Sequence, residues 1–464
     1  MKLPQGPQSL PLLQMLRWIV SPMSYMEACA KHYGDIFTLQ LGTTPKVFVS
    51  NPEALQQILT SDTKELEAPG ELNQLFAGLL GKRSLITTTS KSEHQRQRQL
   101  LMPPFHGDRM RSYGQVISNV TEKIISQWEI NKTFCLRSAT QAITMRVIMQ
   151  AVFGLYDSPR AQKIEQLLRE ILEETSSPLS VAFLYFPVLQ KDFGPHSPWG
   201  KRVRRQQKVD QLIYEEIRDR REQADSSRTD ILSLLMEAKD EAGQLMTDEE
   251  LHDELMTLLV AGHETTATAL AWALYWIHKL PSVREKLLQE IDSLGGNLDS
   301  SSIFKLPYLN AVYCETLRIY PVGMLTFGRV VKTPLSLAGH QLEPGTEVIG
   351  SIYLTHQRED LYPEPKKFKP ERFLERQFSP FEYLPFGGGA RRCIGMAFAQ
   401  FEMKVALAVI LSRCELALVD NGEVKPKRRG LVTGQNRSIQ MLLKSKRSLK
   451  SLQPIPEAPS TARN

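Results

Sequence analysis

One cysteine, Cys393, stands in a segment that is rich in glycine and arginine. The segment reads FGGGARRCIG from Phe386 to Gly395, and an apolar stretch of good helix-forming residues follows it. Backbone N–H groups at the start of a helix carry partial positive charge, which favours a thiolate over a thiol. Glycines let a flat ligand approach the backbone closely. Arg391, close to the sulfur, can hold an anionic group of that ligand with a forked hydrogen bond.

The chemistry that fits this loop is ligation of a haem iron by a single thiolate. A thiolate ligand pushes electron density onto the iron and favours cleavage of an O–O bond. The chain has five cysteines at scattered positions and no CxxC pair, which argues against a disulfide framework and against a zinc site. The alternative is a small buried cysteine that opens an ordinary core helix.

The loop resembles the haem-binding loop of the cytochrome P450 superfamily, Phe-x-x-Gly-x-Arg-x-Cys-x-Gly. Its fixed positions are filled by Phe386, Gly389, Arg391, Cys393 and Gly395. The resemblance implies haem b as the cofactor, Cys393 as its axial thiolate, and Phe386, Arg391 and Gly395 as further cofactor-binding residues. It also implies a mainly α-helical fold with small β regions.

A second group of chemically active residues lies in a long apolar segment. The sequence TDEE at 247–250 has the form of a capping box, so we expect a helix over residues 248–278. Gly262, Glu264 and Thr265 stand at its centre. A glutamate in an apolar helix is costly unless it has a partner or a wet cavity. Such violations of local rules often mark functional sites.

This centre resembles the Ala-Gly-x-(Asp/Glu)-Thr motif of cytochrome P450s. By that resemblance, Gly262 opens the helix and leaves room for dioxygen, Thr265 hydrogen-bonds the bound oxygen, and Glu264 relays protons from solvent. Cleavage of the O–O bond needs protons in a pocket that otherwise stays dry. The alternative is a threonine that bonds back to its own helix. A membrane span is excluded, because His263 and Glu264 would lie at its centre.

Three more residues are expected to bind the cofactor. His94 and Arg98 are four positions apart, so on a helix they share one face and can grip one carboxylate. The resemblance implies that this carboxylate is a haem propionate and that Arg329, in a strand-like stretch at 327–331, turns toward a propionate. The alternative for His94 and Arg98 is a solvated polar face.

A third motif predicts a structural group of charges. Glu315 and Arg318 form an ExxR pair on one helix face, which Pro321 ends. By the same resemblance they form a buried triad behind the haem loop with Arg372, which belongs to the segment PERF at 370–373. Removing one member of such a group leaves an uncompensated charge, at a cost of ~3–5 kcal/mol. We expect these three residues to fix geometry and to take no part in catalysis.

The composition is that of a soluble globular protein, with 464 residues, 42% hydrophobic and 23% charged. No linker divides the chain, so we expect one domain over 1–464, with a proline-rich N-terminal hinge at 1–20 and a disordered tail at 450–464. Residues 10–20 are apolar but too short to cross a membrane, and the N-terminal segment does not have the pattern of a signal peptide. We expect a cytoplasmic monomer without a transmembrane anchor, and a peripheral membrane contact by the N-terminal stretch stays open.

The net charge of +6 is concentrated in part in two runs of Lys and Arg at 425–429 and 444–447. A solvated face is the plainest interpretation of such runs, and no nucleic-acid partner is expected. A docking surface for an acidic redox partner is a third interpretation. Since the chain has no flavin or iron–sulfur domain, the electrons are expected to come from ferredoxin and ferredoxin reductase. Arg96, Arg392 and the two runs form the expected docking patch.

The substrate is expected to be apolar. Residues 176–200 are aromatic and aliphatic, and in a P450 they would lie near the lid over the substrate entrance. One cation of the basic run 201–205 could meet a substrate carboxylate, although solvated charges on a lid helix are the plainer alternative.

Together these patterns predict a bacterial, O₂-dependent haem-thiolate monooxygenase that hydroxylates a long-chain fatty acid or related lipid. The general style of the sequence resembles soluble bacterial relatives, including cyanobacterial ones, of fatty-acid and alkane hydroxylases. The alternatives are a terpenoid hydroxylase with the same mechanism, a haem-binding sensor or electron-transfer protein, and a haem-free helical binding protein. The pair Glu264-Thr265 argues against a sensor or electron carrier, because neither function needs a proton relay.

Overall fold

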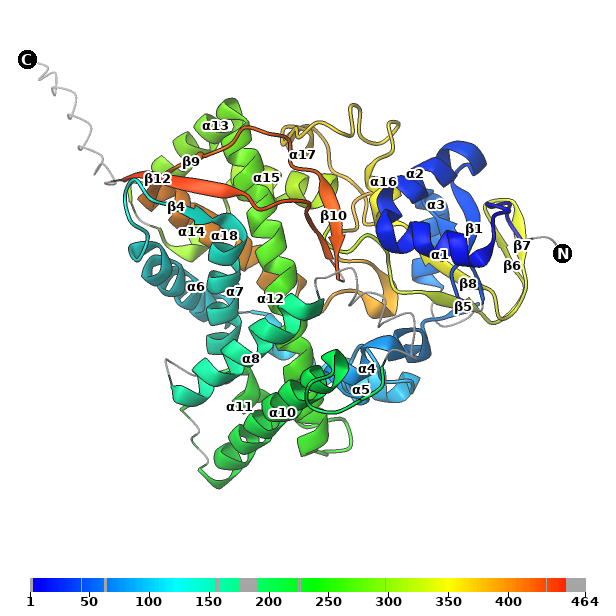
Figure 1. The fold of residues 1–464 in the computed structure, drawn as a ribbon, viewed down its shortest axis with the longest axis horizontal. Helices are drawn as coiled ribbons and strands as arrows, with labels where there is room; N and C mark the ends of the chain where they lie inside the picture. The colour runs from blue at the N-terminus through cyan, green and yellow to red at the C-terminus, as the bar shows by residue number, and fades with distance from the viewer. Residues whose placement is uncertain are drawn as a thin grey trace, which may run out of the picture.

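A computed structural model of the protein describes residues 3–447, except 43, 62–64, 108, 155–157, 176–189, 224, 226, 297 and 431. A large helical part lies on the left of Figure 1, and a smaller part built around a five-stranded sheet lies on the right. The fold is therefore mainly α with small β regions, as predicted. The expected tail at 450–464 and most of the expected lid at 176–200 lie outside the described residues.

Helices make up most of the described chain. In order they are α1 (Pro11–Val20), α2 (Pro22–Tyr33), α3 (Pro52–Thr60), α4 (Ala77–Leu80), α5 (Lys91–Leu101), α6 (Arg109–Ser126), α7 (Leu136–Phe153), α8 (Pro159–Thr175), α10 (Pro198–Glu222), α11 (Ile231–Glu237), α12 (Asp248–Lys279), α13 (Pro281–Asp292), α14 (Ser300–Phe304), α15 (Pro307–Ile319), α16 (Ile352–His356), α17 (Arg372–Glu375) and α18 (Met396–Arg413). Short 3₁₀ turns add η1 (Gly70–Phe76), η2 (Pro103–Phe105) and η4 (Gly389–Arg391).

The strands are short and form small sheets. They are β1 (Ile36–Gln40), β2 (Pro45–Val49), β3 (Leu66–Glu67), β4 (Thr133–Cys135), β5 (Arg329–Val331), β6 (Leu335–Leu337), β7 (His340–Leu342), β8 (Glu347–Gly350), β9 (Cys414–Leu418), β10 (Pro426–Arg429), β11 (Val432–Gln435) and β12 (Gln440–Lys446). The five-stranded sheet has the order β1-β2-β8-β5-β3, and the three-stranded sheet has the order β4-β12-β9. Only β2 and β8 pair in parallel among the described strands, with Val47 opposite Val348.

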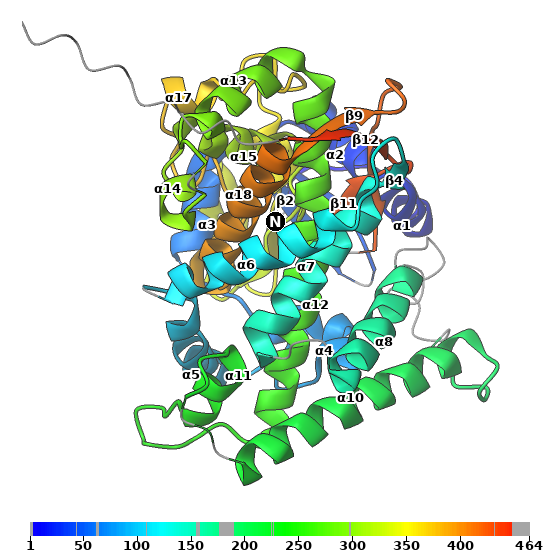
Figure 2. The same cartoon turned by 90° about the vertical axis from the view of Figure 1, so that its left-hand side faces the viewer.

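The helix that positions the site is α12, which runs through the middle of the molecule (Figures 1 and 2). Its first turn is closed by the predicted capping box: the Thr247 hydroxyl accepts the N–H of Glu250, and the Glu250 carboxylate accepts the N–H of Thr247. Its 32 residues span about 48 Å. Apolar side chains surround it because it packs against α7, α15 and α18 at once. The long central helix expected from the sequence is confirmed.

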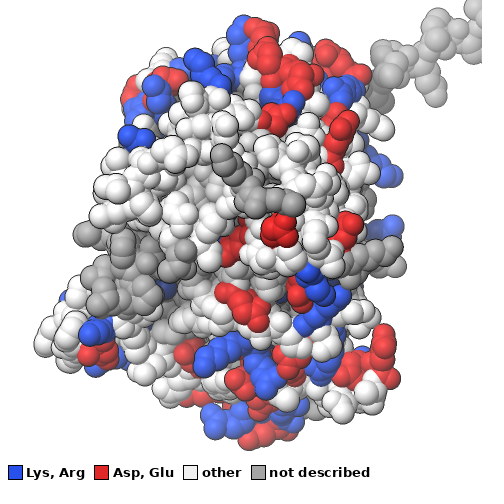
Figure 3. Space-filling view, turned by 90° about the vertical axis from the view of Figure 1, so that its right-hand side faces the viewer, with Lys and Arg blue, Asp and Glu red and all other residues white. Residues whose placement is uncertain are grey.

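The N-terminal segment lies on the five-stranded sheet. The carbonyls of Pro4 and Gln5 accept hydrogen bonds from Thr38 of β1, and the Trp18 side chain of α1 packs edge-on against Phe48 of β2. The outer face of α1 is apolar and exposed through five side chains: Leu10, Leu12, Leu13, Leu16 and Val20. Figure 3 views the side of the molecule that carries this segment, and few charged side chains lie in its central area.

The structure refines the expected helical stretch at 107–175. Strand β4 interrupts it between α6 and α7, because the chain there pairs with β12 of the C-terminal sheet. None of the described helices combines the length and the apolarity that a bilayer crossing requires.

Candidate functional site

The loop before α18 holds Cys393 in a fixed backbone frame. The Cys393 N–H donates to the Phe386 carbonyl at 3.0 Å. Gly387 and Gly389 adopt φ of 66° and 67°, a region that side-chain-bearing residues rarely enter. A Cβ atom on Gly388 would come within 2.8 Å of a methyl group of Leu59 in α3. The glycines of the motif are therefore needed both for the turn and for close packing.

The Cys393 side chain lies in the loop directly before α18. It is accessible to solvent, yet it is enclosed densely enough that burial raises the pKa of its thiol above the ordinary value. The backbone N–H of Gly395 and the guanidinium groups of Arg98 and Arg392 oppose this effect and lower the pKa. A metal ion bound to such a sulfur removes the proton outright. A thiol that is both enclosed and accessible has the setting that a buried planar ligand requires.

Four of the predicted cofactor-binding residues converge from three elements. His94 and Arg98 come from α5, Arg329 from β5, and Arg391 from the loop. Burial, together with the charges of Arg391, Arg98 and Arg329, lowers the pKa of His94 to about 3. His94 is therefore a neutral imidazole, 7% exposed, beside three guanidinium groups. A solvated face is excluded for His94, and the cluster is suited to bind carboxylates.

The guanidinium groups of this cluster are held in place by backbone carbonyls. Arg391 donates to the carbonyls of Ala68 and Leu85, Arg329 donates to the carbonyl of Gly388, and Arg98 donates to the carbonyl of Arg392. These backbone carbonyls are neutral acceptors that fix the direction of the guanidinium groups.

The centre of α12 places its polar residues beside a cavity. Ala261, Glu264 and Thr265 all line this cavity. The Thr265 hydroxyl donates to the Ala261 carbonyl at 2.6 Å, the bond that the sequence left open as an alternative. The Glu264 carboxylate accepts hydrogen bonds from Arg137 at 2.5 Å and from Gln141 at 2.9 Å.

Arg137 and Gln141 are residues that the sequence interpretation missed. Both lie on α7, more than 120 positions before Glu264. They are polar residues four positions apart at one end of an apolar helix, and this spacing is the signal that could have found them. Their hydrogen bonds supply the partner that a glutamate in an apolar helix needs.

The structure gives Gly262 a packing role. Helix α12 continues without interruption through this residue, and Gly262 is not among the residues that line the cavity. A Cβ atom there would lie 3.0 Å from Cδ1 of Ile148 on α7. Gly262 therefore allows the close approach of α7 and α12, and its expected role beside bound dioxygen stays a prediction.

The predicted triad is assembled and buried. Glu315 accepts two hydrogen bonds from Arg318, at 2.7 and 2.8 Å, and one from Arg372 at 3.2 Å. The Lys369 N–H adds a fourth bond at 2.8 Å. The side chains of Glu315 and Arg318 are fully buried, and Arg318 also donates to the carbonyl of His356. This group joins α15 to the segment that leads into the loop of Cys393.

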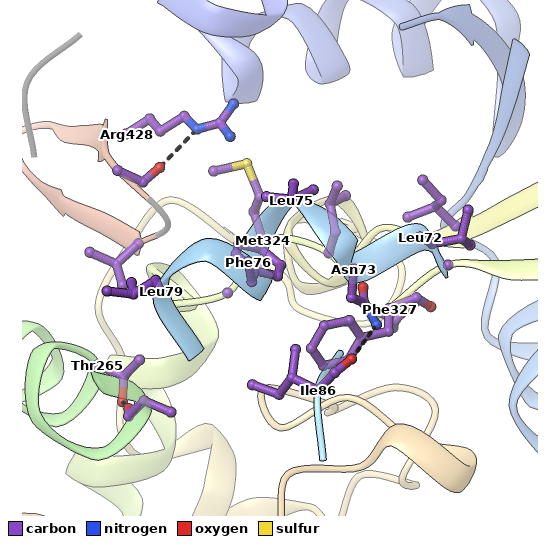
Figure 4. A pocket seen from close by; sticks show the side chains of 18 of the residues that line it. Leu72, Asn73, Leu75, Phe76, Leu79, Ile86, Thr265, Met324, Phe327 and Arg428 are labelled. Carbon is purple, nitrogen blue, oxygen red and sulfur yellow. Dashed lines mark hydrogen bonds between the residues drawn. The ribbon is translucent and has the colours of Figure 1, made fainter. Parts of the chain in front are cut away.

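The cavity beside α12 has a volume of about 490 Å³ and mostly apolar walls. In Figure 4, Leu79 lies between Arg428 and Thr265, and Leu75 and Phe76 lie next to it, nearer the centre of the view. Residues of η1, α4, α12 and the hairpin β10–β11 contribute to the lining. The volume and the walls suit an elongated apolar molecule.

The structure places two parts of the expected docking patch in other contacts. Arg96 is paired with Asp240 and Glu250 at 2.5 and 2.7 Å. Arg428 and Arg429, from the first basic run, line the cavity beside α12. The docking role of this patch stays a prediction. A count of cations along the sequence cannot reveal these inward-facing positions.

Comparison with known proteins identifies the family. The family model for cytochrome P450 matches residues 4–443. The chain belongs to the cytochrome P450 family. A Mycobacterium tuberculosis protein provisionally named cytochrome P450 135B1 is 35% identical over 451 residues, which cover 97% of this chain and 93% of the relative. Another, provisionally named cytochrome P450 138, is 31% identical over 414 residues, or 88% and 89% of the two chains.

Among solved structures, a cyanobacterial P450, CYP120A1 with bound retinoic acid, superposes with a TM-score of 0.82. The match covers 96% of this chain and all of that chain, at 24% identity, and shows that the two share a fold. Membership of the P450 family makes the protein a haem monooxygenase, with haem b and a cysteine thiolate as axial ligand. The enclosed, accessible thiol of Cys393 and the cationic cluster near His94 fit this cofactor.

Proposed function

We propose that Cys393 would be the thiolate ligand of the haem and that Phe386, Arg391 and Gly395 would also bind the cofactor. The observation that carries this proposal is the accessible Cys393 sulfur just before α18, beside the Gly395 N–H and the guanidinium groups of Arg98 and Arg392. The test is the red-shifted absorbance that ferrous, thiolate-ligated haem gives with carbon monoxide. C393A should abolish this absorbance, and C393H should keep haem while losing the red shift. A red-shifted spectrum in either variant would refute the assignment.

The same proposal assigns the cationic cluster to the haem propionates. His94, Arg98 and Arg329 would donate to these carboxylates, together with Arg391 from the loop. The convergence of these residues from α5, β5 and the loop supports this role. Neutral His94 can donate one hydrogen bond from its ring while the arginines supply the charge. R98Q should lower haem retention during gel filtration more than R413Q does, since Arg413 is a half-buried residue that pairs with Glu122 at the end of α18.

The chain's part in the reaction is to keep water out and to deliver protons. When bound, the haem supplies reductive activation of dioxygen, so that one oxygen atom enters a C–H bond of the substrate and the other leaves as water. Thr265 is the hydroxyl of α12 that lines the cavity, and in our proposal it donates a hydrogen bond where oxygen binds. It must first leave the Ala261 carbonyl. Glu264 passes protons toward Thr265 when its carboxylate releases Arg137.

For the substrate we propose a long-chain fatty acid or a related lipid, oxidised at a C–H bond. The mostly apolar wall around Leu75, Phe76 and Leu79 supports an apolar chain. A terpenoid would use the same wall, and the test separates the two classes. Fatty acids and sesquiterpenes are titrated into the ferric protein, and the spin-state change that follows loss of water from the iron is recorded. A response to sesquiterpenes alone would overturn the fatty-acid proposal.

For the electron donor we propose ferredoxin and its reductase, in the cytoplasm of a bacterium, acting on a monomer. Arg392, an exposed residue next to Cys393, remains as the docking cation. The second basic run contributes less, because Arg447 pairs with Asp292. R392E should slow ferredoxin-supported turnover and leave peroxide-supported turnover unchanged. Equal losses in both assays would refute docking at this residue.

A further inference from the structure

The basic run at the start of α10 contains four cations, and the structure separates them. Lys201 is exposed to solvent. Arg204 donates to an aspartate and to a backbone carbonyl, and Arg205 forms ion pairs with two glutamates of α8. Arg202 alone of the four lines the cavity beside α12. The run is therefore three surface charges and one inward-facing guanidinium.

The phase of α10 explains why Arg202 turns inward. Val209 and Ile213, seven and eleven positions further on, are fully buried, and these spacings bring all three residues to one helix face. One turn after Arg202, the Gln206 amide donates to the carbonyl of Leu79 in α4, another residue of the cavity wall. The first turns of α10 thus form part of the cavity wall.

The carboxylates of the cavity wall are already engaged elsewhere. The described lining includes two acidic side chains, Glu264 and Glu347. Glu264 is paired with Arg137, and Glu347 is paired with Lys46. Neither acid is therefore available to neutralise another cation of the wall.

Arg202 differs from the other arginines that line the cavity. Arg428 and Arg429 each donate their Nε–H to a carbonyl of their own hairpin. Within the described residues, Arg202 has no hydrogen bond and no ion pair, and it lies over the Trp199 ring at 5.3 Å from its centre. Burial lowers its pKa, and Glu174, which opposes that shift, already pairs with Arg205.

We infer that Arg202 binds the carboxylate of the substrate, so that the pocket selects long-chain carboxylic acids over uncharged lipids of the same length. A guanidinium matches a carboxylate with two parallel hydrogen bonds. An arginine keeps its charge at neutral pH even when burial lowers its pKa. A bound carboxylate compensates that desolvated charge, while the alkyl chain lies along the apolar wall in Figure 4. This inference rests on the substrate proposed above and names its head group and the residue that recognises it.

The experiment is a spin-state titration of the ferric holoprotein with two matched probes, palmitic acid and 1-hexadecanol. It compares the wild type, R202Q and the control R204Q, which removes one charge from the exposed side of the same helix. R202Q should weaken binding of the acid roughly tenfold to hundredfold, the usual value of a charge-assisted hydrogen bond, and leave binding of the alcohol unchanged. R204Q should change neither. R202K keeps the positive charge but cannot form two parallel hydrogen bonds. Its affinity for the acid should therefore lie between those of the wild type and R202Q.

Each other outcome overturns the inference. Equally weakened binding of the acid and the alcohol would mean that Arg202 contributes to the shape of the cavity wall and does not recognise the carboxylate. Unchanged acid binding in R202Q, or wild-type protein that binds the alcohol and not the acid, would refute the carboxylate contact while the lipid substrate stands. Wild-type protein that responds to neither probe would refute the lipid proposal itself and the inference with it. The carbon monoxide spectrum of each variant confirms that it carries intact haem.

Discussion

Replacing Glu315 tests whether the buried triad holds the haem loop in place. Glu315 has no exposed surface and accepts four hydrogen bonds, from Arg318, Arg372 and the Lys369 backbone. The E315A variant leaves two guanidinium groups without their counter-charge. Arg318 is fully buried, and the Arg372 side chain is 7% exposed. Neither cation can turn to solvent without moving α15 or the segment before the loop.

The expected cost follows from this burial. Loss of one member of a buried ion group destabilises a protein by about 3–5 kcal/mol, a large part of the ~5–15 kcal/mol that a folded domain has in total. We expect E315A to lower the free energy of unfolding by that amount and to release haem at lower urea concentrations. E315Q keeps the shape and the neutral acceptor, so its effect should be smaller.

The assay follows urea denaturation of the holoprotein by far-UV circular dichroism and by the haem absorbance. The control is E371Q in the neighbouring segment. Glu371 is 29% exposed in its side chain and bridges Lys286 and the Tyr308 hydroxyl, so its loss should cost about 1 kcal/mol or less. Equal destabilisation by E315A and E371Q, or a change below about 1 kcal/mol in E315A, would refute the reasoning.

Three further predictions concern the proton path and the response to pH. T265V removes the hydroxyl that lines the cavity, and product formed per electron consumed should fall about 100-fold, whereas unchanged coupling would exclude Thr265 as a donor. R137Q removes the ion-pair partner of the α12 carboxylate, and it should change the pH profile of kcat while leaving substrate binding unchanged; a shift in binding alone would contradict this. His252 lies between Asp210 and Asp253. Burial lowers its pKa, but the hydrogen bonds to both carboxylates outweigh burial and raise the pKa to about 9. Because this is above the ordinary value near 6.5, the stabilisation, roughly 3 kcal/mol, is complete below about pH 6.5 and is lost as the pH rises through about 9. In urea titrations between about pH 6.5 and pH 9, the free energy of unfolding of H252Q should depend less on pH than that of the wild type. A wild-type free energy of unfolding that does not change over this pH range would contradict the raised pKa of His252.

The sequence alone determined the elements whose signals are local. The haem loop could be recognised because ligand, glycines and arginine are covalent neighbours within ten residues. The capping box fixed the start of α12, since its two hydrogen bonds join residues three apart. The pairs His94/Arg98 and Glu315/Arg318 followed from the helical period. In each case the backbone geometry of a single element is enough to bring the residues together.

Tertiary structure alone decided which partners those residues meet. The pairing of Glu264 with Arg137 joins positions 127 apart, and it depends on how α7 packs against α12. That same packing requires Gly262, whose spacing in the motif gives no hint of a neighbouring helix. Arg202 carries the same local charge signal as Arg204, and the cavity beneath α10 makes only one of them inward-facing. A sequence records which charges a chain has, but which of them face solvent is settled by the packing of distant elements, because burial and ion pairing are properties of the assembled fold.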